Sequence, residues 1–482
     1  MRRTFFLSLL LCVLTALNLE AKITLPAIIS DHMVLQQNTQ AALFGWAQPG
    51  ATVTATATWQ MSPVTVKADA KTGYFLLRVP TPSAGGPYEI TLKDTESLTI
   101  KDVLIGEVWF CSGQSNMEMP VKGYGSQPAK DGTKYIVSAK ASRPIRIVNV
   151  ARKSSLKEET QSTGSWMQHT PTAVASTSAT AYFFAEALQA AIDVPVGIIH
   201  TSWGGSSIQT WIKRDVIEKE FKGEFDLGYL DGKAAVKSEN QDPCLLWNGQ
   251  VAPLVPYTFK GMIWYQGETN RGNPEQYIRL QASYVQMMRE VFSVPDAPFY
   301  FVQIAPYPYD NPDAWTCGYF YEAQQKSLQV IPHSGMATTV DIGQYGTIHP
   351  CRKQEVGQRL AYLALQHDYG FDAIKADAPT YKNVEFKEGK ALVTFNVDDL
   401  GLSPMGEDID GFEISGSDKV FHKAKARYQS GKVVIVSSDE VRIPWPSVIA
   451  SATSRRVAST TISAFRRLPS VRMTGNSEPS RP

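Results

Sequence analysis

Residues 103–117 read VLIGEVWFCSGQSNM, and this stretch carries the strongest indication of the fold. Its first eight residues are mostly apolar and β-branched, which is typical of a strand buried in a core. The pattern then breaks at a small polar turn with one hydroxyl group, that of Ser115, near its centre. Open α/β sheets place their ligand sites at the carboxyl ends of such strands. Ser115 is therefore a candidate nucleophile, although Ser, Gly and Asn also favour ordinary turns.

Outward from this strand, residues 106 to about 370 alternate apolar runs with stretches of helical periodicity. The expected strands include 194–200, 261–265 and 335–340, and the expected helices are 177–193, 274–292, 316–330 and 352–366. Such alternation predicts an α/β fold with a parallel sheet flanked by helices. The sequences on either side alternate apolar and polar residues between turn signals, which predicts amino-terminal and carboxyl-terminal β-sandwich-like regions.

The bulk properties limit the class of protein. A chain of 482 residues is too long for one ordinary core, so two or three domains are expected. With 43% hydrophobic and 19% charged residues, the composition is that of a globular protein. The net charge is +1 and no long basic run occurs, which argues against nucleic acid or an anionic membrane as the main partner.

The first 21 residues resemble a signal peptide. Arg2 and Arg3 precede a short apolar stretch, and small residues near Ala21 offer a cleavage site. A secreted or periplasmic protein with no membrane span in the mature chain is therefore expected. It keeps four scattered cysteines, which we expect to be buried or singly paired. No Cys-x-x-Cys or His/Cys cluster indicates zinc, and no metal or other cofactor is expected.

Four strand-like runs of the central region end in polar or glycine-rich turns, and together these turns supply the parts of an acyl-transfer site. Acyl transfer by Ser115 needs a base and donors aimed at the developing oxyanion. His349 is the natural base, and Asn270 can donate a side-chain amide. Gly204 and Gly205 can bring a backbone N–H close to a substrate oxygen because no Cβ blocks the approach.

These residues in this order resemble those of the SGNH (GDSL-like) hydrolase superfamily. The amino-acid sequences of the motifs resemble those of the sialate O-acetylesterase family. The motifs are GQSNM, WGGSSIQTW, LVPYTFKGMIWYQGETN and DIGQYGTIHPCRKQEVGQRLA. The stretches LPAIISDHMVLQQ and GWAQPGATV resemble the leading β domain of that family. The resemblance runs from about residue 23 to Pro444.

The resemblance implies a role for each matching residue. Ser115 is the nucleophile, and His349 is the general base and later the acid. The Ser115 backbone N–H, Gly205 (with Gly204 as the neighbouring alternative) and Asn270 form the oxyanion hole. The resemblance does not identify the group that orients the His349 imidazole.

Many superfamily members orient the histidine with an aspartate three residues before it, and here that position is Gly346. Asp341 and a backbone carbonyl are the two candidate orienters: Asp341 would complete a triad, and a backbone carbonyl would leave a Ser–His dyad. Glu268 also has two candidate roles, which are lining the site or bracing its loop through hydrogen bonds.

The resemblance implies a secreted carbohydrate esterase that removes O-acetyl groups from sialic acid through an acetyl-enzyme intermediate. The alternatives are an acetylesterase for another acetylated sugar such as xylan, and a carbohydrate-binding protein without catalysis. The motifs supply residues for the reaction and not for the recognition of a particular sugar, so the sugar-binding residues are not predicted. The oligomeric state is not predicted either. Four aromatic residues near the motifs, Trp203, Trp211, Trp264 and Tyr265, are candidates for stacking on a sugar or for the core.

The predicted domains are a signal peptide (1–21), an amino-terminal β domain (22–105), an SGNH hydrolase domain (106–372), a carboxyl-terminal β region (373–444) and a tail (445–482). The tail is rich in Arg, Ser and Thr, shows no clean strand alternation and is expected to be disordered. It also lacks the ending typical of the family. Read one base out of frame, its codons permit that ending, with Ala at Trp445–Pro446 and Asp at Met473–Thr474. The tail is therefore predicted to arise from a frameshift near 443–445.

Overall fold

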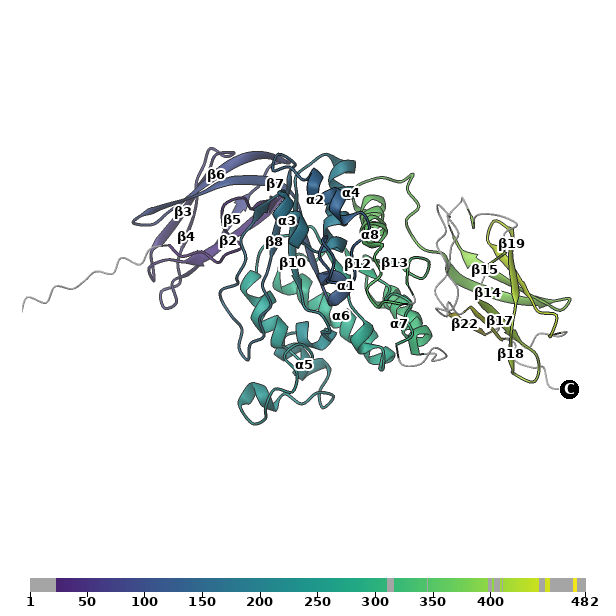
Figure 1. Ribbon diagram of the computed structural model, residues 1–482. Helices are drawn as coiled ribbons and strands as arrows, with labels where there is room; N and C mark the ends of the chain where they lie inside the picture. The colour runs from purple at the N-terminus through teal and green to yellow at the C-terminus, as the bar shows by residue number, and fades with distance from the viewer. Residues whose placement is uncertain are drawn as a thin grey trace, which may run out of the picture.

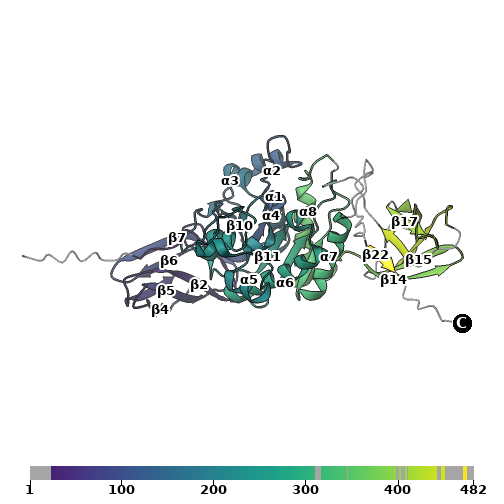
Figure 2. The same cartoon turned by 90° about the horizontal axis from the view of Figure 1, so that it is seen from below.

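The computed structural model describes residues 23–309, 316–344, 346–397, 401–402, 408–409, 411–441, 447–450 and 471–474. They form three parts in chain order: a β-rich amino-terminal region, a central α/β region and a carboxyl-terminal β region. Figures 1 and 2 show these parts side by side, with the α/β region in the middle. The predicted signal peptide lies outside the described residues.

The central sheet is built around the long strand β7 (Ser97–Gly113), whose second half contains the apolar run of the opening motif. The strand order is β13-β12-β11-β7-β10-β8-β9. All neighbours from β13 to β8 are parallel, and only β9 is antiparallel to its neighbour. The other strands are β8 (Ile145–Asn149), β9 (Met167–Gln168), β10 (Val196–Ser202), β11 (Gly261–Tyr265), β12 (Phe299–Val302) and β13 (Ser334–Ala337). The predicted parallel arrangement is confirmed for the strands from β13 to β8.

The amino-terminal region shares β7 with the central sheet. The first half of β7 pairs antiparallel with β6 (Gly85–Lys93), and β1 (Val34–Gln36) pairs parallel with the middle of β7. The sheet is therefore mixed, and the predicted boundary at residue 105 lies inside one continuous strand. The remaining strands of this region are β3 (Thr52–Ala57), β4 (Val64–Lys67) and the separate antiparallel pair β2 (Gln40–Trp46) and β5 (Tyr74–Pro80).

Helices flank the central sheet, as the sequence periodicity predicts. The four long helices lie within two residues of their predicted bounds and are α4 (Ala179–Ile192), α6 (Pro274–Val291), α7 (Thr316–Val330) and α8 (Lys353–Asp368). Shorter helices in the connecting loops are α2 (Gly132–Ser138), α3 (Pro171–Ser176) and α5 (Arg214–Glu220). Among the described residues, no helix combines the length and the apolar character needed to cross a membrane.

Alternate side chains of β7 build two different cores, because successive residues of a strand point to opposite faces. Val108 and Phe110 belong to the cluster that includes the buried side chains of α6 and α7. Trp109 and Cys111 belong to the cluster formed with α4 and α8. Burial on both faces explains why this part of the strand is an almost unbroken apolar run.

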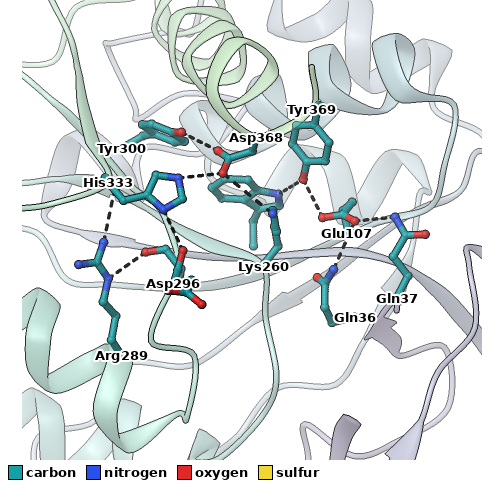
Figure 3. Close-up of polar contacts among 12 residues, drawn as sticks. Gln36, Gln37, Glu107, Lys260, Arg289, Asp296, Tyr300, His333, Asp368 and Tyr369 are labelled. Carbon is teal, nitrogen blue, oxygen red and sulfur yellow. Dashed lines mark hydrogen bonds and ion pairs between the residues drawn. The ribbon is translucent and has the colours of Figure 1, made fainter. Parts of the chain in front are cut away.

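The amino-terminal edge of the central sheet is closed by a polar network, which Figure 3 shows. The buried Glu107 carboxylate accepts hydrogen bonds from Gln37 Nε2 at 2.6 Å and from the Tyr369 hydroxyl at 2.7 Å. The neighbouring Asp368 accepts from the Tyr300 hydroxyl at 2.5 Å. These contacts join the amino-terminal region, the sheet and the end of α8. Ser115 and the loops of the sequence motifs quoted above leave the opposite edge.

The carboxyl-terminal region has a core of its own, which includes Val393, Ile414 and Val434. Two antiparallel sheets surround it, with the orders β14-β15-β20-β19-β16 and β18-β17-β21-β22. Their strands before residue 444 are β14 (Thr380–Lys387), β15 (Lys390–Asn396), β16 (Asp408–Ile409), β17 (Phe412–Ser415), β18 (Phe421–Lys423), β19 (Lys425–Ser430) and β20 (Val433–Ser437).

Two short strands occur in the tail that was expected to be disordered. β21 (Ser447–Ala450) pairs antiparallel with β17, and β22 (Val471–Thr474) pairs with β21. The open edge of β17 offers unpaired backbone groups to any nearby extended segment. The rest of the tail, residues 445–446, 451–470 and 475–482, lies outside the described residues.

Candidate active site

The loops singled out in the sequence all leave the carboxyl edge of the central sheet. β7, β10 and β11 are adjacent parallel strands, and β13 lies two strands further along. Because parallel strands end at the same edge, the loops that follow them meet there. Ser115 is the first residue of the four-residue helix α1 (Ser115–Glu118), which begins directly after β7 and lies near the centre of the molecule in Figure 1.

The Ser115 backbone N–H is available to a ligand because the first N–H groups of a helix have no partner inside it. The loop after β10 packs against this serine. A Cβ atom added to Gly204 would lie 3.3 Å from Ser115 Cβ, so glycine permits the close contact. The nucleophile and the glycine-rich loop are thus neighbours.

The two glycines of that loop differ in the availability of their backbone N–H groups. Gly204 N–H donates to Glu118 Oε2 at 2.9 Å, so it is already used. Gly205 N–H has no hydrogen-bond acceptor among the described residues. Gly205 also has a φ of +73°, a conformation that glycine adopts without strain. This contrast favours Gly205 over Gly204 as the donor to an oxyanion.

The Asn270 carboxamide is held with its oxygen turned toward two donors. Asn270 Oδ1 accepts from the Ile208 backbone N–H at 3.0 Å and from Gln266 Nε2 at 2.8 Å. Its Nδ2 donates to Gln209 Oε1 at 3.0 Å. A carboxamide nitrogen carries two hydrogens, so one N–H of Asn270 is left for a substrate oxygen.

His349 is held as a neutral imidazole. Its Nδ1 lies 2.8 Å from Gln127 Oε1, and an oxygen acceptor there favours the tautomer with the proton on Nδ1. Burial, with a smaller contribution from the positive charge of Lys353, lowers the pKa of His349 to about 4. At neutral pH the Nε2 atom therefore carries the lone pair that a general base needs.

Tyr124 connects Ser115 with His349. Its hydroxyl donates to the Ser115 backbone oxygen at 3.0 Å, and its ring packs edge-on to the His349 ring with centroids 5.3 Å apart. Within the described part of the chain, no hydrogen bond joins Ser115 Oγ to the imidazole itself. The two side chains thus flank one tyrosine, and catalytic hydrogen bonds are often long before substrate binds.

Asp341 pairs with Arg359 and is not placed beside His349. The guanidinium donates to both carboxylate oxygens, at 2.7 and 2.5 Å. Among the described residues, the hydrogen-bond partner of His349 Nδ1 is the Gln127 side chain, which is neither Asp341 nor a backbone carbonyl. The position of Gly346 faces open space, with no atom within 4 Å of an added Cβ.

Glu268 braces the loop, because it is buried and bonded inside the protein. Its Oε1 accepts from Asn116 Nδ2 at 2.6 Å, and the other side of the Asn116 carboxamide accepts from Lys353 Nζ at 2.5 Å. Burial raises the pKa of Glu268 and lowers that of Lys353 to about 7. A buried row of acid, amide and amine therefore lies directly behind the nucleophile.

Of the four aromatic candidates for sugar stacking, three are core residues. Trp211, Trp264 and Tyr265 are at most 1% exposed. Trp203 is partly exposed, and the Arg152 guanidinium lies 5.6 Å from its ring centroid. Trp203, just before the glycine-rich loop, is the member of this set that a sugar can reach.

The cysteines play no part in this constellation. Cys111 and Cys244 are buried free thiols, and Cys317 and Cys351 are partly buried free thiols. In the described part of the chain, no group of three His, Cys, Asp or Glu residues is arranged to hold a metal ion.

The sequence reasoning missed several residues that position the site, namely Tyr124, Gln127, Gln209, Gln266 and Lys353. Gln209, Gln266 and Lys353 stand inside the motifs quoted above but were assigned no role, whereas Tyr124 and Gln127 lie outside those motifs. Tyr124 and Gln127 lie in a glycine-rich loop after α1, and Lys353 begins a helix. Membership of a motif is the signal that could have found Gln209, Gln266 and Lys353.

Comparison with protein families gives a match at residues 105–366 to a profile described as a carbohydrate esterase, sialic acid-specific acetylesterase. The chain is also 33% identical to a carbohydrate acetylesterase from Xanthomonas citri whose crystal structure is known. The two structures superimpose with a TM-score of 0.79 over 90% of this chain and 95% of the other.

Curated relatives give the same picture across most of the chain. Sialate O-acetylesterase from Mus musculus is 27% identical over 454 residues, which cover 80% of this chain and 81% of the relative. The Homo sapiens enzyme of the same name is 28% identical over 410 residues, covering 76% of this chain and 75% of the relative. The similarity therefore extends on both sides of the matched central region.

Proposed function

Because the chain belongs to the sialic acid-specific acetylesterase family of carbohydrate esterases, we propose that it removes O-acetyl groups from sialic acid by Ser115–His349 catalysis. It is an ester hydrolase, and the proposal concerns its mechanism, its sugar and its location. The signal-like first 21 residues support a secreted or periplasmic enzyme, where acetylated glycans are accessible.

The reaction begins when Ser115 Oγ attacks the acetyl carbonyl while His349 Nε2 takes the hydroxyl proton. The tetrahedral oxyanion accepts hydrogen bonds from the Ser115 and Gly205 backbone N–H groups and from Asn270 Nδ2, the SGNH-type arrangement. His349 then returns the proton to the sugar oxygen, which leaves as an alcohol. Water, deprotonated by His349, hydrolyses the acetyl-enzyme and releases acetate.

Gln127 takes the orienting role in this proposal. An orienting group holds the imidazole in one tautomer and does not need to accept the proton, so a neutral carboxamide oxygen is sufficient. Asp341 was the sequence-based candidate, but both of its oxygens are bonded to Arg359. We therefore assign Asp341 to the support of the loop before His349.

The observation that carries the proposal is the set of donors and acceptors left unused around Ser115. The Gly205 N–H, one Asn270 N–H and the His349 Nε2 lone pair are all unpaired within the described residues, whereas their neighbours Gly204 and Glu268 are engaged. Two free donors and one free base are what an acyl transfer at Ser115 requires.

Acetate release from purified protein tests the mechanism. Ser115→Ala should lower kcat by about three decades or more, as removal of a nucleophile does. The matched control is Ser112→Ala, a buried serine in the strand β7 that leads to Ser115. A folded Ser115→Ala protein with near-normal acetate release would contradict the proposal, and an inactive wild-type protein that still binds the glycan would support the non-catalytic alternative.

The sugar is tested with a panel of substrates. O-acetylated sialic acid should give the highest kcat/KM, and acetylated xylan represents the alternative acetylesterase. A higher kcat/KM on xylan would keep the mechanism and reject the sialate assignment.

A further inference from the structure

The Asn116 side chain binds three loops of the proposed active site at once. It is fully buried and belongs to the helix that begins with Ser115. Its Nδ2 donates to Glu268 Oε1 at 2.6 Å, in the loop that carries Asn270, and to the Ile348 backbone oxygen at 3.0 Å. Ile348 directly precedes His349. One carboxamide thus connects the nucleophile, oxyanion and histidine loops.

The third contact of this carboxamide comes from Lys353, a residue that the proposed chemistry does not use. Lys353 Nζ donates to Asn116 Oδ1 at 2.5 Å and lies 5.3 Å from the centroid of the Tyr265 ring. The lysine is only 1% exposed. A buried amine is costly, and an apolar residue of the same length is often at least as stable at such a position. Stability alone therefore gives no reason for a lysine here.

The contacts of Lys353 decide which way the Asn116 carboxamide points. With the amine at Oδ1, both hydrogens of Nδ2 are directed to Glu268 and to Ile348. In the reversed orientation, the amide oxygen would face two acceptors, and its NH₂ group would face the ammonium. Lys353 therefore excludes the reversed state, in which the three loops lose their common bond.

We propose that Lys353 is a positioning residue that acts through Asn116. It holds the loops of Ser115, Asn270 and His349 in the relative positions that the proposed catalysis requires. The inference rests on the proposed Ser115–His349 mechanism. It assigns no contact between Lys353 and the substrate.

Lys353 also acts on the base through its charge. The Lys353 ammonium faces Glu268 and Tyr265 on other elements and Cys351 in the loop just before α8. His349 faces Tyr124 and Gln127. The positive charge of Lys353 is one of the two causes that lower the pKa of His349. Removing it should raise that pKa and move the acid limb of kcat/KM to higher pH.

The test uses the full chain and the variants Lys353→Met and Lys353→Met/Glu268→Gln, with Arg352→Met as the control. Arg352 is the neighbouring residue and pairs with Glu355 at the surface. Lys353→Met should lower kcat about 10–100-fold with little change in KM, because misplacement of reacting groups by about 1 Å costs up to 10²-fold. Arg352→Met should keep the wild-type kcat and pH profile.

The double variant separates positioning from charge balance. It removes both buried charges, so its Tm should recover relative to Lys353→Met, while kcat stays low. Recovery of both Tm and kcat would mean that Lys353 only neutralises Glu268, and the proposal would be overturned. If Lys353→Met does not fold, the kcat of the double variant decides alone.

Wild-type protein and Ser115→Ala, measured in the same series, separate this inference from the mechanism on which it rests. If Ser115→Ala is active, the mechanism itself fails. If Ser115→Ala is inactive but Lys353→Met keeps the wild-type kcat and acid limb, only the positioning role fails.

Discussion

A carboxamide or an imidazole has a donor side and an acceptor side, and at the scale of single residues this asymmetry organises the site. Asn270 has its oxygen engaged by Ile208 and Gln266, so its nitrogen is the end that the proposed mechanism directs to the substrate. His349 has Nδ1 engaged by Gln127, so Nε2 is the end left for the proton. In each case a neighbouring residue determines which atom of the side chain remains free to take part in the proposed reaction.

Asn270→Ala should lower kcat about 10²–10³-fold with little change in KM, the range for one lost oxyanion donor. Steady-state kinetics on an acetylated sugar provide the measurement. Asn273→Ala is the control, since Asn273 caps α6 by accepting from Gln276 N–H. It should cost about 1 kcal/mol of stability and leave kcat unchanged. A change in KM alone would move Asn270 to substrate binding.

The pH profile should report His349 as a base with a low pKa. Catalysis needs the neutral imidazole, and a pKa of about 4 means that kcat/KM falls only as the pH drops through about 4. Gln127→Glu would place a carboxylate at Nδ1 and favour the imidazolium, so the acid limb should move to higher pH. Asp341→Asn should leave the limb in place because Asp341 faces Arg359. An unshifted limb in Gln127→Glu would remove Gln127 from the orienting role.

At the scale of secondary-structure elements, the position of α8 controls the histidine loop. α8 begins at Lys353, four residues after His349, and packs along α4. A Cβ atom added to Gly357 would lie 2.6 Å from the Phe184 backbone nitrogen and 2.7 Å from Phe183 Cβ. Glycine is therefore required at this close approach of the two helices.

Gly357→Ala should push α8 away from α4 and destabilise the protein by about 1–3 kcal/mol, the usual cost of overpacking. Urea unfolding measures the loss. Gly272→Ala is the matched control, since no atom lies within 4 Å of its added Cβ, and it should be neutral or slightly stabilising. Equal stability of the two variants would show that the helix contact tolerates the extra methyl group.

At the scale of the whole molecule, the proposed catalytic residues all lie in the central α/β region, and the β regions flank it (Figure 2). β7 is common to the amino-terminal sheet and the central sheet, so these two regions share one framework. The carboxyl-terminal region has a separate core that begins after α8. An alteration at its end therefore leaves the catalytic set between Ser115 and His349 complete.

The frameshift proposed for residues 445–482 makes a prediction about the gene and about stability. Sequencing should find one missing or extra base near the Ile443 codon, relative to a frame that encodes the family ending. The frame-repaired chain should be more soluble and resist proteolysis near residue 445, because a selected final strand protects a sheet edge better than an unselected one. The loss of a packed strand is worth several kcal/mol, against a total stability of roughly 5–15 kcal/mol.

Two results would count against the frameshift. One is an alternative frame that does not encode the family ending. The other is an experimental structure in which the native tail packs well around β21 and β22. The described pairing of β21 with β17 makes the second outcome directly measurable.

The sequence by itself determined the parallel sheet, the four long helices and the positions of Ser115, Gly205, Asn270 and His349 at loops on one edge. These features follow from local patterns, because periodicity defines the elements and parallel strands bring their carboxyl ends together. The order of the motifs along the chain was enough to indicate the family. No long-range pairing had to be known for either conclusion.

Only the tertiary structure decided which polar groups meet. Gln127 rather than Asp341 bonds His349 from 222 positions away, and Lys353 reaches Asn116 across 237 positions. Nothing in the local sequence distinguishes these partners, since a hydrogen bond between distant loops depends on how the elements pack and not on residue type. The residues that perform the proposed chemistry were therefore readable from motifs, whereas the residues that orient them became visible only in the fold.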